Sequence, residues 1–375
     1  MASQLHLISL PHTKTMQDGW TTCAYTAKVV KFAKMMTGRD RKVILYSSED
    51  SDAICDEHVP LITSAERDGW FGEHDENDLG RGGFTWNSTD PWWSTMNERA
   101  ITEIANRCDK QDLLLIIAGY AQKPISDALP FLTVAEWGVG YEGIFSGFCA
   151  FESNAWMHWL YGKRDWSNGR WYDEVIPNFF DPNEFYPIDS TLGPGPDDYI
   201  LYVGRLIERK GVHIAAMISE RLGIPLKIAG QGGVEWGPGW VRYPEGEARA
   251  PGLEFLGPVG VERRAELMAG AIATLVPTTY IEPFGGVAVE AMMAGCPAVT
   301  TDWGAFRETV TEGVSGYRFR TLQEGCDAVL KADKLDRRAI QQYALDNYSL
   351  DAVAPRFDTW FDRLDGLWTT SGWDA

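Results

Sequence analysis

The chain has 375 residues, more than a single hydrophobic core usually supports, so we expect two domains. Its formal net charge of −19 opposes binding to bulk nucleic acid or to an anionic membrane surface, unless a local patch reverses the sign. No apolar stretch is long enough to span a bilayer, and six scattered cysteines without a Cys-x-x-Cys pair argue against a disulfide framework or a zinc site. These features lead us to expect a cytoplasmic protein without a transmembrane segment.

Strand and helix patterns alternate through the first half of the chain. Apolar runs at 5–10 and 42–47 flank a predicted helix over 22–36, and a further strand is predicted at 113–118. The order strand, loop, helix, strand is the way in which a parallel α/β sheet begins.

The predicted first helix and the residues after it form a basic stretch, 28–42, with six basic side chains and one acidic residue, Asp40. One interpretation is a solvated helix face with cations favoured near the helix end. The other is a docking patch for an anionic acceptor, such as phospholipid headgroups or nucleic acid.

An aromatic segment, 84–93, precedes a predicted helix over 98–107. Its rings are suited to stacking on sugars or bases, but anchoring of a long loop to the core explains them about as well. The next strand, predicted at 131–134, leads into a segment that contains Glu136, and Gly138 with Gly140 suggests a tight loop there.

The second half repeats the α/β pattern after a break at 193–196, Gly-Pro-Gly-Pro, which we interpret as a hinge. A predicted strand at 199–203 is followed by a loop that contains Arg205 and Lys210. A forked guanidinium and a compact ammonium are both suited to a pyrophosphate. The strand at 226–229 is likewise followed by glycines, at the end of a strand where ligands bind in open sheets.

The most informative stretch begins with an apolar run at 271–276, which predicts a buried strand. A polar loop with Glu282 follows, and two glycines then lead into a helix that holds Glu290. The glycines permit close backbone approach, and the start of a helix offers unpaired N–H groups to an anion. Carboxylates on either side accept hydrogen bonds from hydroxyls, so the layout suits a nucleotide sugar.

Glu282 and Glu290 stand eight residues apart around Pro-Phe-Gly-Gly, and Glu290 begins the string Glu-Ala-Met-x-Ala-Gly-x-Pro-x-Val. This sequence resembles the donor-site signature of retaining family-4 glycosyltransferases of the GT-B fold. Arg205 and Lys210, five residues apart in a strand-to-helix loop, resemble the second signature of that family.

The resemblance implies an α/β fold with two Rossmann-like domains that face a cleft. We expect an N-terminal acceptor-binding domain over residues 1–188 and a C-terminal donor-binding domain over 189–348. Residues 349–375, with apolar side chains at helical spacing, are expected to form a helix that crosses back to the first domain.

The resemblance also implies roles for the donor-site residues. Glu282 would hold sugar hydroxyls, Glu290 would bind the ribose, and Arg205 with Lys210 would bind the diphosphate. The remaining donor-binding candidates are Gly204, Gly230, Pro258 and Val259, together with the backbone N–H groups of Phe284, Gly285 and Gly286.

Candidates in the first half rest on position alone. Many family members carry a histidine or an acidic residue shortly after the strand predicted at 131–134, and Glu136 takes the comparable place as a catalytic candidate beside Glu282, Arg205 and Lys210. Gly19, Trp20 and Gly138 are candidates for an acceptor or interdomain loop.

We therefore predict a retaining, metal-independent hexosyl- or pentosyltransferase with a nucleoside-diphosphate sugar as co-substrate and no cofactor. The acceptor hydroxyl would belong to a glycan, a lipid-linked sugar or a protein. One alternative is a DNA-base glycosyltransferase acting on hydroxymethyl-pyrimidines. The others are a GT-B epimerase or hydrolase and a non-catalytic nucleotide-sugar-binding protein.

Asp50 and Asp52 formally match the Asp-x-Asp metal motif of a different glycosyltransferase fold. We expect no metal site there, because short acidic pairs are frequent in acidic loops and GT-B enzymes do not resemble metal-dependent ones.

Overall fold

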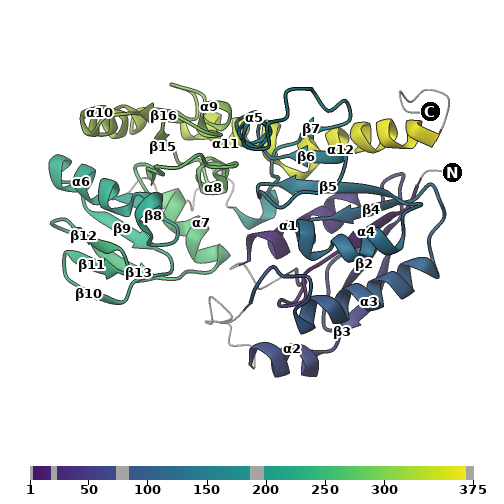
Figure 1. Ribbon diagram of the computed structural model, residues 1–375. Helices are drawn as coiled ribbons and strands as arrows, with labels where there is room; N and C mark the ends of the chain where they lie inside the picture. Colours follow the sequence, from purple (N-terminus) through teal and green to yellow (C-terminus); the bar gives the residue numbers. More distant parts are fainter. Residues whose placement is uncertain (1–2, 18–22, 73–83, 186–197, 369–375) are drawn as a thin grey trace. The chain divides into compact units, whose positions relative to one another are not determined.

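The computed structural model describes residues 3–17, 23–72, 84–185 and 198–368. Gly19, Trp20 and the predicted hinge at 193–196 lie outside these ranges. The chain divides into two compact units (Figure 1). Unit 1 comprises Met1–Glu152, Trp159–Phe179 and Val353–Ala375, and unit 2 comprises Ser153–His158 and Phe180–Ala352.

Unit 1 contains a seven-stranded sheet in which every pair of neighbours is parallel. Four of its strands are buried along their whole length or nearly so, as expected for a sheet that helices cover on both faces. In spatial order the strands are β3 (Glu57–Ile62), β2 (Val43–Ser48), β1 (Leu5–Ile8), β4 (Leu113–Ile116), β5 (Thr133–Val139), β6 (Phe148–Phe151) and β7 (Glu174–Val175).

Helices cover both faces of this sheet. On one face, Met96, Ala100 and Ile104 of α3 form a core cluster with apolar residues of the four strands β1–β4. On the other face, Phe32 of α1 contacts Trp137 of β5 with a ring-centroid distance of 4.4 Å. The helices with residues in unit 1 are α1 (Ala24–Met36), α2 (Ser64–Phe71), α3 (Pro91–Ala105), α4 (Lys123–Ala128), α5 (Asn154–Lys163) and α12 (Leu350–Asp365), with a 3₁₀ turn η1 (Gly119–Ala121).

Unit 2 is built on a six-stranded parallel sheet. One core cluster packs α7, α8 and α11 on the sheet, and a second packs α6 and α10. The strands in spatial order are β13 (Glu254–Gly257), β9 (Leu226–Ala229), β8 (Ile200–Val203), β14 (Thr274–Val276), β15 (Ala298–Thr301) and β16 (Gly316–Phe319). The helices are α6 (Val212–Leu222), α7 (Val261–Gly270), α8 (Gly286–Met293), α9 (Phe306–Thr309), α10 (Leu322–Ala332) and α11 (Arg337–Tyr348), with 3₁₀ turns η2 (Pro182–Glu184) and η3 (Glu208–Lys210). A further 3₁₀ turn, η4 (Gly366–Trp368), belongs to unit 1.

A small antiparallel sheet of three strands, β10–β12, follows β9 and lies near β13 (Figure 1). Its strands are β10 (Glu235–Gly237), β11 (Trp240–Tyr243) and β12 (Gly246–Arg249). Val241, Tyr243 and Ala248 face inward and join the core cluster of α6 and α10. Sequence patterns did not predict this sheet.

Two predicted elements of unit 1 have different bounds from those expected. The helix predicted over 98–107 begins at Pro91, because Asp90 takes the N-cap position and a proline is well tolerated in the first turn. Part of the aromatic segment is therefore helical, and Trp93 is fully buried. The strand predicted at 131–134 runs from Thr133 to Val139, so Glu136 lies in a strand, and the loop expected at Gly138 and Gly140 was wrong for Gly138.

Candidate functional site

The predicted donor residues follow four neighbouring strands of the unit 2 sheet. Gly204 comes after β8, Gly230 after β9, Pro258 after β13 and Glu282 after β14, and these strands are adjacent in the order β13, β9, β8, β14. Since carboxyl ends of parallel strands share one edge, the four segments meet at the edge where open α/β sheets bind ligands.

Close backbone packing fixes the loops at this edge. The N–H of Gly204 donates to Ala229 over 3.0 Å, and the N–H of Gly230 donates to Gly257 over 2.9 Å. A Cβ atom on Gly230 would lie 1.8 Å from the carbonyl oxygen of Gly204, so no larger residue fits without a backbone shift. The glycines at these positions therefore allow the two loops to touch.

Lys210 and Glu282 form the central contact of the site. The Lys210 ammonium donates to both carboxylate oxygens of Glu282, at 3.0 Å and 2.7 Å. The two side chains are 22% and 10% exposed, so the pair is largely shielded from water. Sequence analysis assigned these residues to different parts of one ligand, and the structure brings them into direct contact.

Two further groups surround this ion pair. Tyr280 places its ring 5.2 Å from the Lys210 ammonium and 4.7 Å from the Arg209 guanidinium. Burial, followed by the charge and hydrogen bond of Glu282, raises the pKa of Tyr280. Arg205 is exposed and lies near enough for its charge to oppose that shift. Tyr280 was missed by sequence analysis, although its position two residues before Glu282 was an available signal.

The helix α8 begins behind these groups. Gly285 is its N-cap residue, with a φ of 78°, and a Cβ there would lie 2.3 Å from the Phe306 ring. A glycine is therefore required both by the left-handed backbone and by the ring. Phe284 is buried, whereas Gly286, the first helical residue, is half-buried and leaves an N–H end that can bind an anion.

Glu290 lies one turn into α8 and is paired with Arg264 of α7. The guanidinium donates to the carboxylate over 3.1 Å, and both side chains are 15% exposed. Sequence analysis did not single out Arg264, and no local pattern connects residues on two different helices. Pro258 is exposed and Val259 half-buried in the loop before α7.

The Glu308 carboxylate, which also belongs to unit 2, accepts hydrogen bonds from two backbone N–H groups and from the side-chain amide of Asn154. Its carboxylate accepts from the N–H of Asn154 at 2.8 Å and of Ala155 at 2.7 Å, at the start of α5. Asn154 and Ala155 belong to unit 2, as Glu308 does. Glu308 is therefore a helix cap.

Glu136, the catalytic candidate of unit 1, is completely buried. Its carboxylate accepts from the N–H groups of Phe145 and Ser146, each at 2.6 Å, and from the hydroxyl of Tyr141 at 2.9 Å. Burial raises the pKa of Glu136 although these hydrogen bonds oppose the shift. These hydrogen bonds give the Glu136 carboxylate a structural role, because they hold the segment after β5 in place. Gly138 lies in β5 with a φ of 58°, and a Cβ there would lie 3.5 Å from the Lys28 side chain.

The basic stretch 28–42 is largely neutralised within unit 1. Lys28 pairs with Glu152, and Lys42 pairs with Glu57 at 2.6 Å. Arg39 donates to Asp358 at 2.9 Å, and Arg41 donates to Asp365 at 2.8 Å. These carboxylate partners weaken the interpretation of this stretch as a patch for an anionic acceptor.

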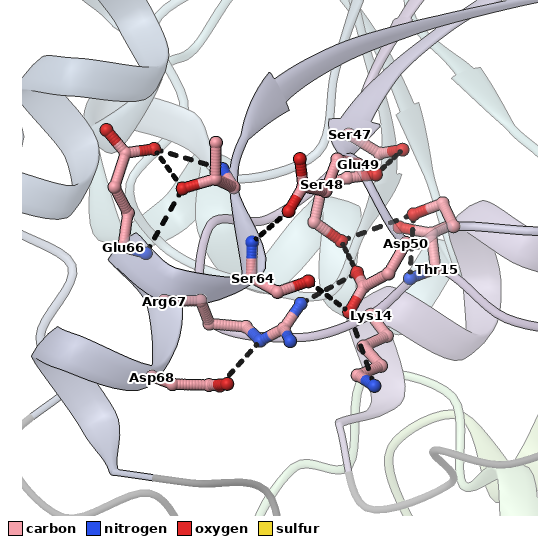
Figure 2. Close-up of polar contacts among 12 residues, drawn as sticks. Lys14, Thr15, Ser47, Ser48, Glu49, Asp50, Ser64, Glu66, Arg67 and Asp68 are labelled. Carbon is pink, nitrogen blue, oxygen red and sulfur yellow. Dashed lines mark hydrogen bonds and ion pairs between the residues drawn. The ribbon is translucent and has the colours of Figure 1, made fainter.

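Asp50 of the Asp-x-Asp sequence is also engaged by protein groups (Figure 2). It accepts from Arg67 at 2.7 Å, from Ser48 at 2.8 Å and from Ser64 at 3.0 Å, and Lys14 lies 3.2 Å away. Among the residues that the structure describes, no three His, Cys, Asp or Glu side chains gather in a way that could hold a metal ion. In the same part of the chain, no helix has the length and apolar character needed to cross a membrane.

Comparisons with known proteins show what the chain is similar to in sequence and in fold. Residues 188–344 match the family described as Glycosyl transferases group 1. The chain is 30% identical over 209 residues to the phosphatidyl-myo-inositol mannosyltransferase of Mycobacterium tuberculosis, covering 51% of this chain and 54% of that protein. Across the first curated relatives, the similarity spans between 30% and 54% of the relative's length.

Solved structures resemble the chain over almost its whole length. AviGT4, a glycosyltransferase involved in avilamycin A biosynthesis, is 18% identical with a TM-score of 0.66 and covers 97% of this chain and 98% of its own. HepE from Anabaena, solved in complex with UDP-glucose, is 15% identical with a TM-score of 0.61 and covers 96% of this chain and 99% of its own. The predicted resemblance is thereby confirmed: the chain has the two Rossmann-like sheets of GT-B glycosyltransferases, and residues 188–344 are a group 1 domain whose relatives are of the family-4 type.

Proposed function

We propose that this chain is a retaining glycosyltransferase that moves a sugar from a nucleoside-diphosphate sugar to an acceptor hydroxyl, without a resident metal ion. The contact between Lys210 and Glu282 carries the proposal, because it joins a cation suited to phosphate and a carboxylate suited to sugar hydroxyls at one strand edge. The group 1 match and the similarity to a mannosyltransferase support it.

The diphosphate would lie against Arg205, Lys210 and the N–H groups at the start of α8. Negative charge grows on the leaving nucleoside diphosphate as the glycosidic bond breaks. Cations and backbone dipoles that are already in place stabilise that charge more in the transition state than in the bound donor, which is the condition for catalysis.

The nucleoside and the sugar would extend to either side of the diphosphate. Glu290, held by Arg264, would accept hydrogen bonds from the ribose hydroxyls. Glu282 would accept from the sugar hydroxyls, and the HepE complex with UDP-glucose supports a nucleotide sugar as the ligand class.

The acceptor hydroxyl would belong to a glycan, a lipid or a protein. A DNA acceptor loses its main support, because Lys28, Arg39 and Arg41 of the basic stretch are paired with carboxylates of the chain. The net charge of −19 opposes DNA binding as well.

The test is donor binding followed by turnover. UDP, GDP, ADP and dTDP and their common sugars are screened by thermal shift, and the bound nucleotide sugar is then used to measure donor turnover. Glu282→Ala and Lys210→Ala should each lower kcat by ~10²–10³, the scale on which enzymes lose rate when one preorganised charge stabiliser is removed.

Glu266→Ala is the control, because its carboxylate pairs with Arg263 on the exposed side of α7 and exposed ion pairs contribute little. Its kcat should stay within about twofold of the original chain, on the scale of such a pair. Near-normal turnover in both site variants would refute the assignment of the donor site, and no shift with any nucleotide or nucleotide sugar would refute the proposed function.

A further inference from the structure

The ion pair of Lys210 and Glu282 is built on two backbone segments that are fixed to each other. The N–H of Thr279, in the loop after β14, donates to the carbonyl of Arg209 in η3 over 2.8 Å. The carbonyl of Glu282 accepts from the N–H of Ala305 over 3.2 Å. The pair is therefore held by its surroundings, and its two charges lie 2.7 Å apart in a largely buried position.

A second carboxylate–cation pair lies in the same unit and provides a contrast. Glu290 pairs with Arg264, but only Glu290 is assigned to the donor, so Arg264 can keep its partner when a ribose binds. Lys210 and Glu282 are both assigned to the donor, and each already satisfies the other. A ligand that engages Lys210 through a phosphate therefore competes with Glu282.

The outcome of this competition depends on which ligand arrives. A complete nucleotide sugar offers phosphate oxygens to Lys210 and hydroxyl donors to Glu282, so both charges receive new partners. A nucleoside diphosphate offers nothing to Glu282, which is 8% exposed. The carboxylate then keeps its hydrogen bond with Tyr280 but loses its cation and faces the negative diphosphate, and the loss of the charged partner from a buried charge is strongly unfavourable.

We propose that the Lys210–Glu282 ion pair makes the site select the intact nucleotide sugar over the nucleoside diphosphate. This inference rests on the proposed function. Once the sugar has been transferred, Glu282 loses the hydroxyl donors of the sugar and returns to Lys210, which displaces the diphosphate. Glu282 is thus a specificity-determining residue that discriminates between donor and spent product, in addition to holding the sugar.

The experiment compares dissociation constants for two ligand pairs, UDP with UDP-glucose and GDP with GDP-mannose, by titration calorimetry on the full chain. Glu282→Gln keeps the size of the side chain and removes its charge. In this variant the nucleoside diphosphate should bind about tenfold more tightly, since Lys210 no longer has a charged competitor. The nucleotide sugar should bind about tenfold more weakly, since its hydroxyls lose a charged acceptor.

Arg264→Gln is the matched control, because it breaks the other ion pair of the site. The nucleoside is common to both ligands, so their two dissociation constants should change by the same factor. Thermal unfolding of each variant checks folding, and Glu282→Asp, which keeps the charge but shortens its reach, is the substitute if the glutamine variant does not fold. Glu282→Asp should also tighten binding of the nucleoside diphosphate and weaken binding of the nucleotide sugar, each by a smaller factor than Glu282→Gln.

Equal changes in both constants for Glu282→Gln would overturn this inference and leave the donor site standing. A failure of the original chain to bind these four ligands and every ADP and dTDP ligand of the thermal-shift screen would overturn the proposed function together with the inference. The inference would be established if the two dissociation constants change in opposite directions in Glu282→Gln and by the same factor in Arg264→Gln.

Discussion

Arg67 is the most completely buried cation of unit 1 that the structure describes, with 1% of its surface exposed. Its position near the start of α2 places it beside Asp50, which follows β2 (Figure 2). Burial alone would raise the pKa of Asp50, but hydrogen bonds from Arg67 and Ser48 outweigh it and hold that pKa well below its usual range. The Asp50 carboxylate thus compensates the charge of the buried Arg67 guanidinium.

We expect Asp50→Asn to lower the free energy of unfolding at pH 7 by about 3 kcal/mol, because it removes the carboxylate 2.7 Å from the buried Arg67 guanidinium and leaves Asp68 at 3.4 Å as the charged partner. A folded-state pKa below the ordinary value of about 3.9 means that the stabilisation is complete above about pH 4 and is lost as the pH falls through the folded-state pKa. The difference between the two proteins, measured by urea unfolding, should therefore be smaller at pH 3 than at pH 7.

Asp52→Asn is the control for this prediction. Asp52 belongs to the same Asp-x-Asp sequence but is exposed, and the oxygen that accepts from the N–H of Gln17 is kept in asparagine. It should change stability by under about 1 kcal/mol. A loss for Asp50→Asn that is the same at every pH would contradict the electrostatic explanation.

At the scale of elements, the loops after β8 and β9 depend on a backbone contact that only glycine permits. We expect Gly230→Ala to destabilise unit 2 by ~1–3 kcal/mol, as overpacking does, since its Cβ would lie 1.8 Å from the Gly204 oxygen. The displaced loop should also weaken nucleotide binding, measured by calorimetry with the nucleotide that binds the original chain.

Gly260→Ala is the control that tests whether the loss of stability in Gly230→Ala comes from the close contact between Gly230 and Gly204. Gly260 precedes α7 at the same edge, has an ordinary φ of −69°, and a Cβ there meets nothing within 4 Å. A smaller loss of stability and unchanged nucleotide affinity are expected. Equal effects of the two substitutions would show that the close approach of the loops is unimportant.

The elements that sequence patterns predicted well are those with local signals. The strand before Glu282 and the helix that holds Glu290 follow directly from an apolar run, two glycines and an apolar helix. The start of α3 at Pro91 was also predictable, because Asp90-Pro91 is a typical helix beginning, but the neighbouring aromatic residues suggested a loop.

Other features depend on residues far apart in the chain. Glu136 is occupied by N–H groups nine and ten residues later, and Glu290 is paired with an arginine on another helix. No spacing rule connects such residues, so their partners become visible only in three dimensions. In the small antiparallel sheet, Trp240–Tyr243 alternates in burial, but four residues are too short for that pattern to be distinctive.

At the scale of the whole molecule, the chain order and the spatial order differ. Residues 353–368 follow unit 2 in sequence but pack with unit 1. Within unit 1, Phe357 of α12 contacts Phe32 at 5.1 Å and Phe179 at 5.8 Å between ring centroids. The last helix therefore contributes to the core of the first unit, and the sequence showed this only as apolar residues at helical spacing.

Phe357→Ala should destabilise unit 1 by ~3–5 kcal/mol, the usual cost of removing a buried phenylalanine ring. Hydrogen exchange measured by mass spectrometry should accelerate in β1 and β5 and remain unchanged in β8 and β14, because core strands exchange through opening of their own unit. Thr359→Ala, an exposed position of the same helix, is the control. Equal acceleration in both units would show that they unfold together.

The return of α12 to unit 1 has a consequence for how the protein is made on the ribosome. Synthesis runs from the N-terminus, so the strands of unit 1 leave the ribosome first. They remain without α12 until the whole of unit 2 has been translated. During that interval the side chains of Phe32, Trp137 and Phe179 lack their contacts with Phe357 and remain open to non-specific association. Unit 2 is able to complete its core earlier, although it is translated later. We therefore expect the first unit to be the last to mature, and the one that depends most on chaperones in the cell.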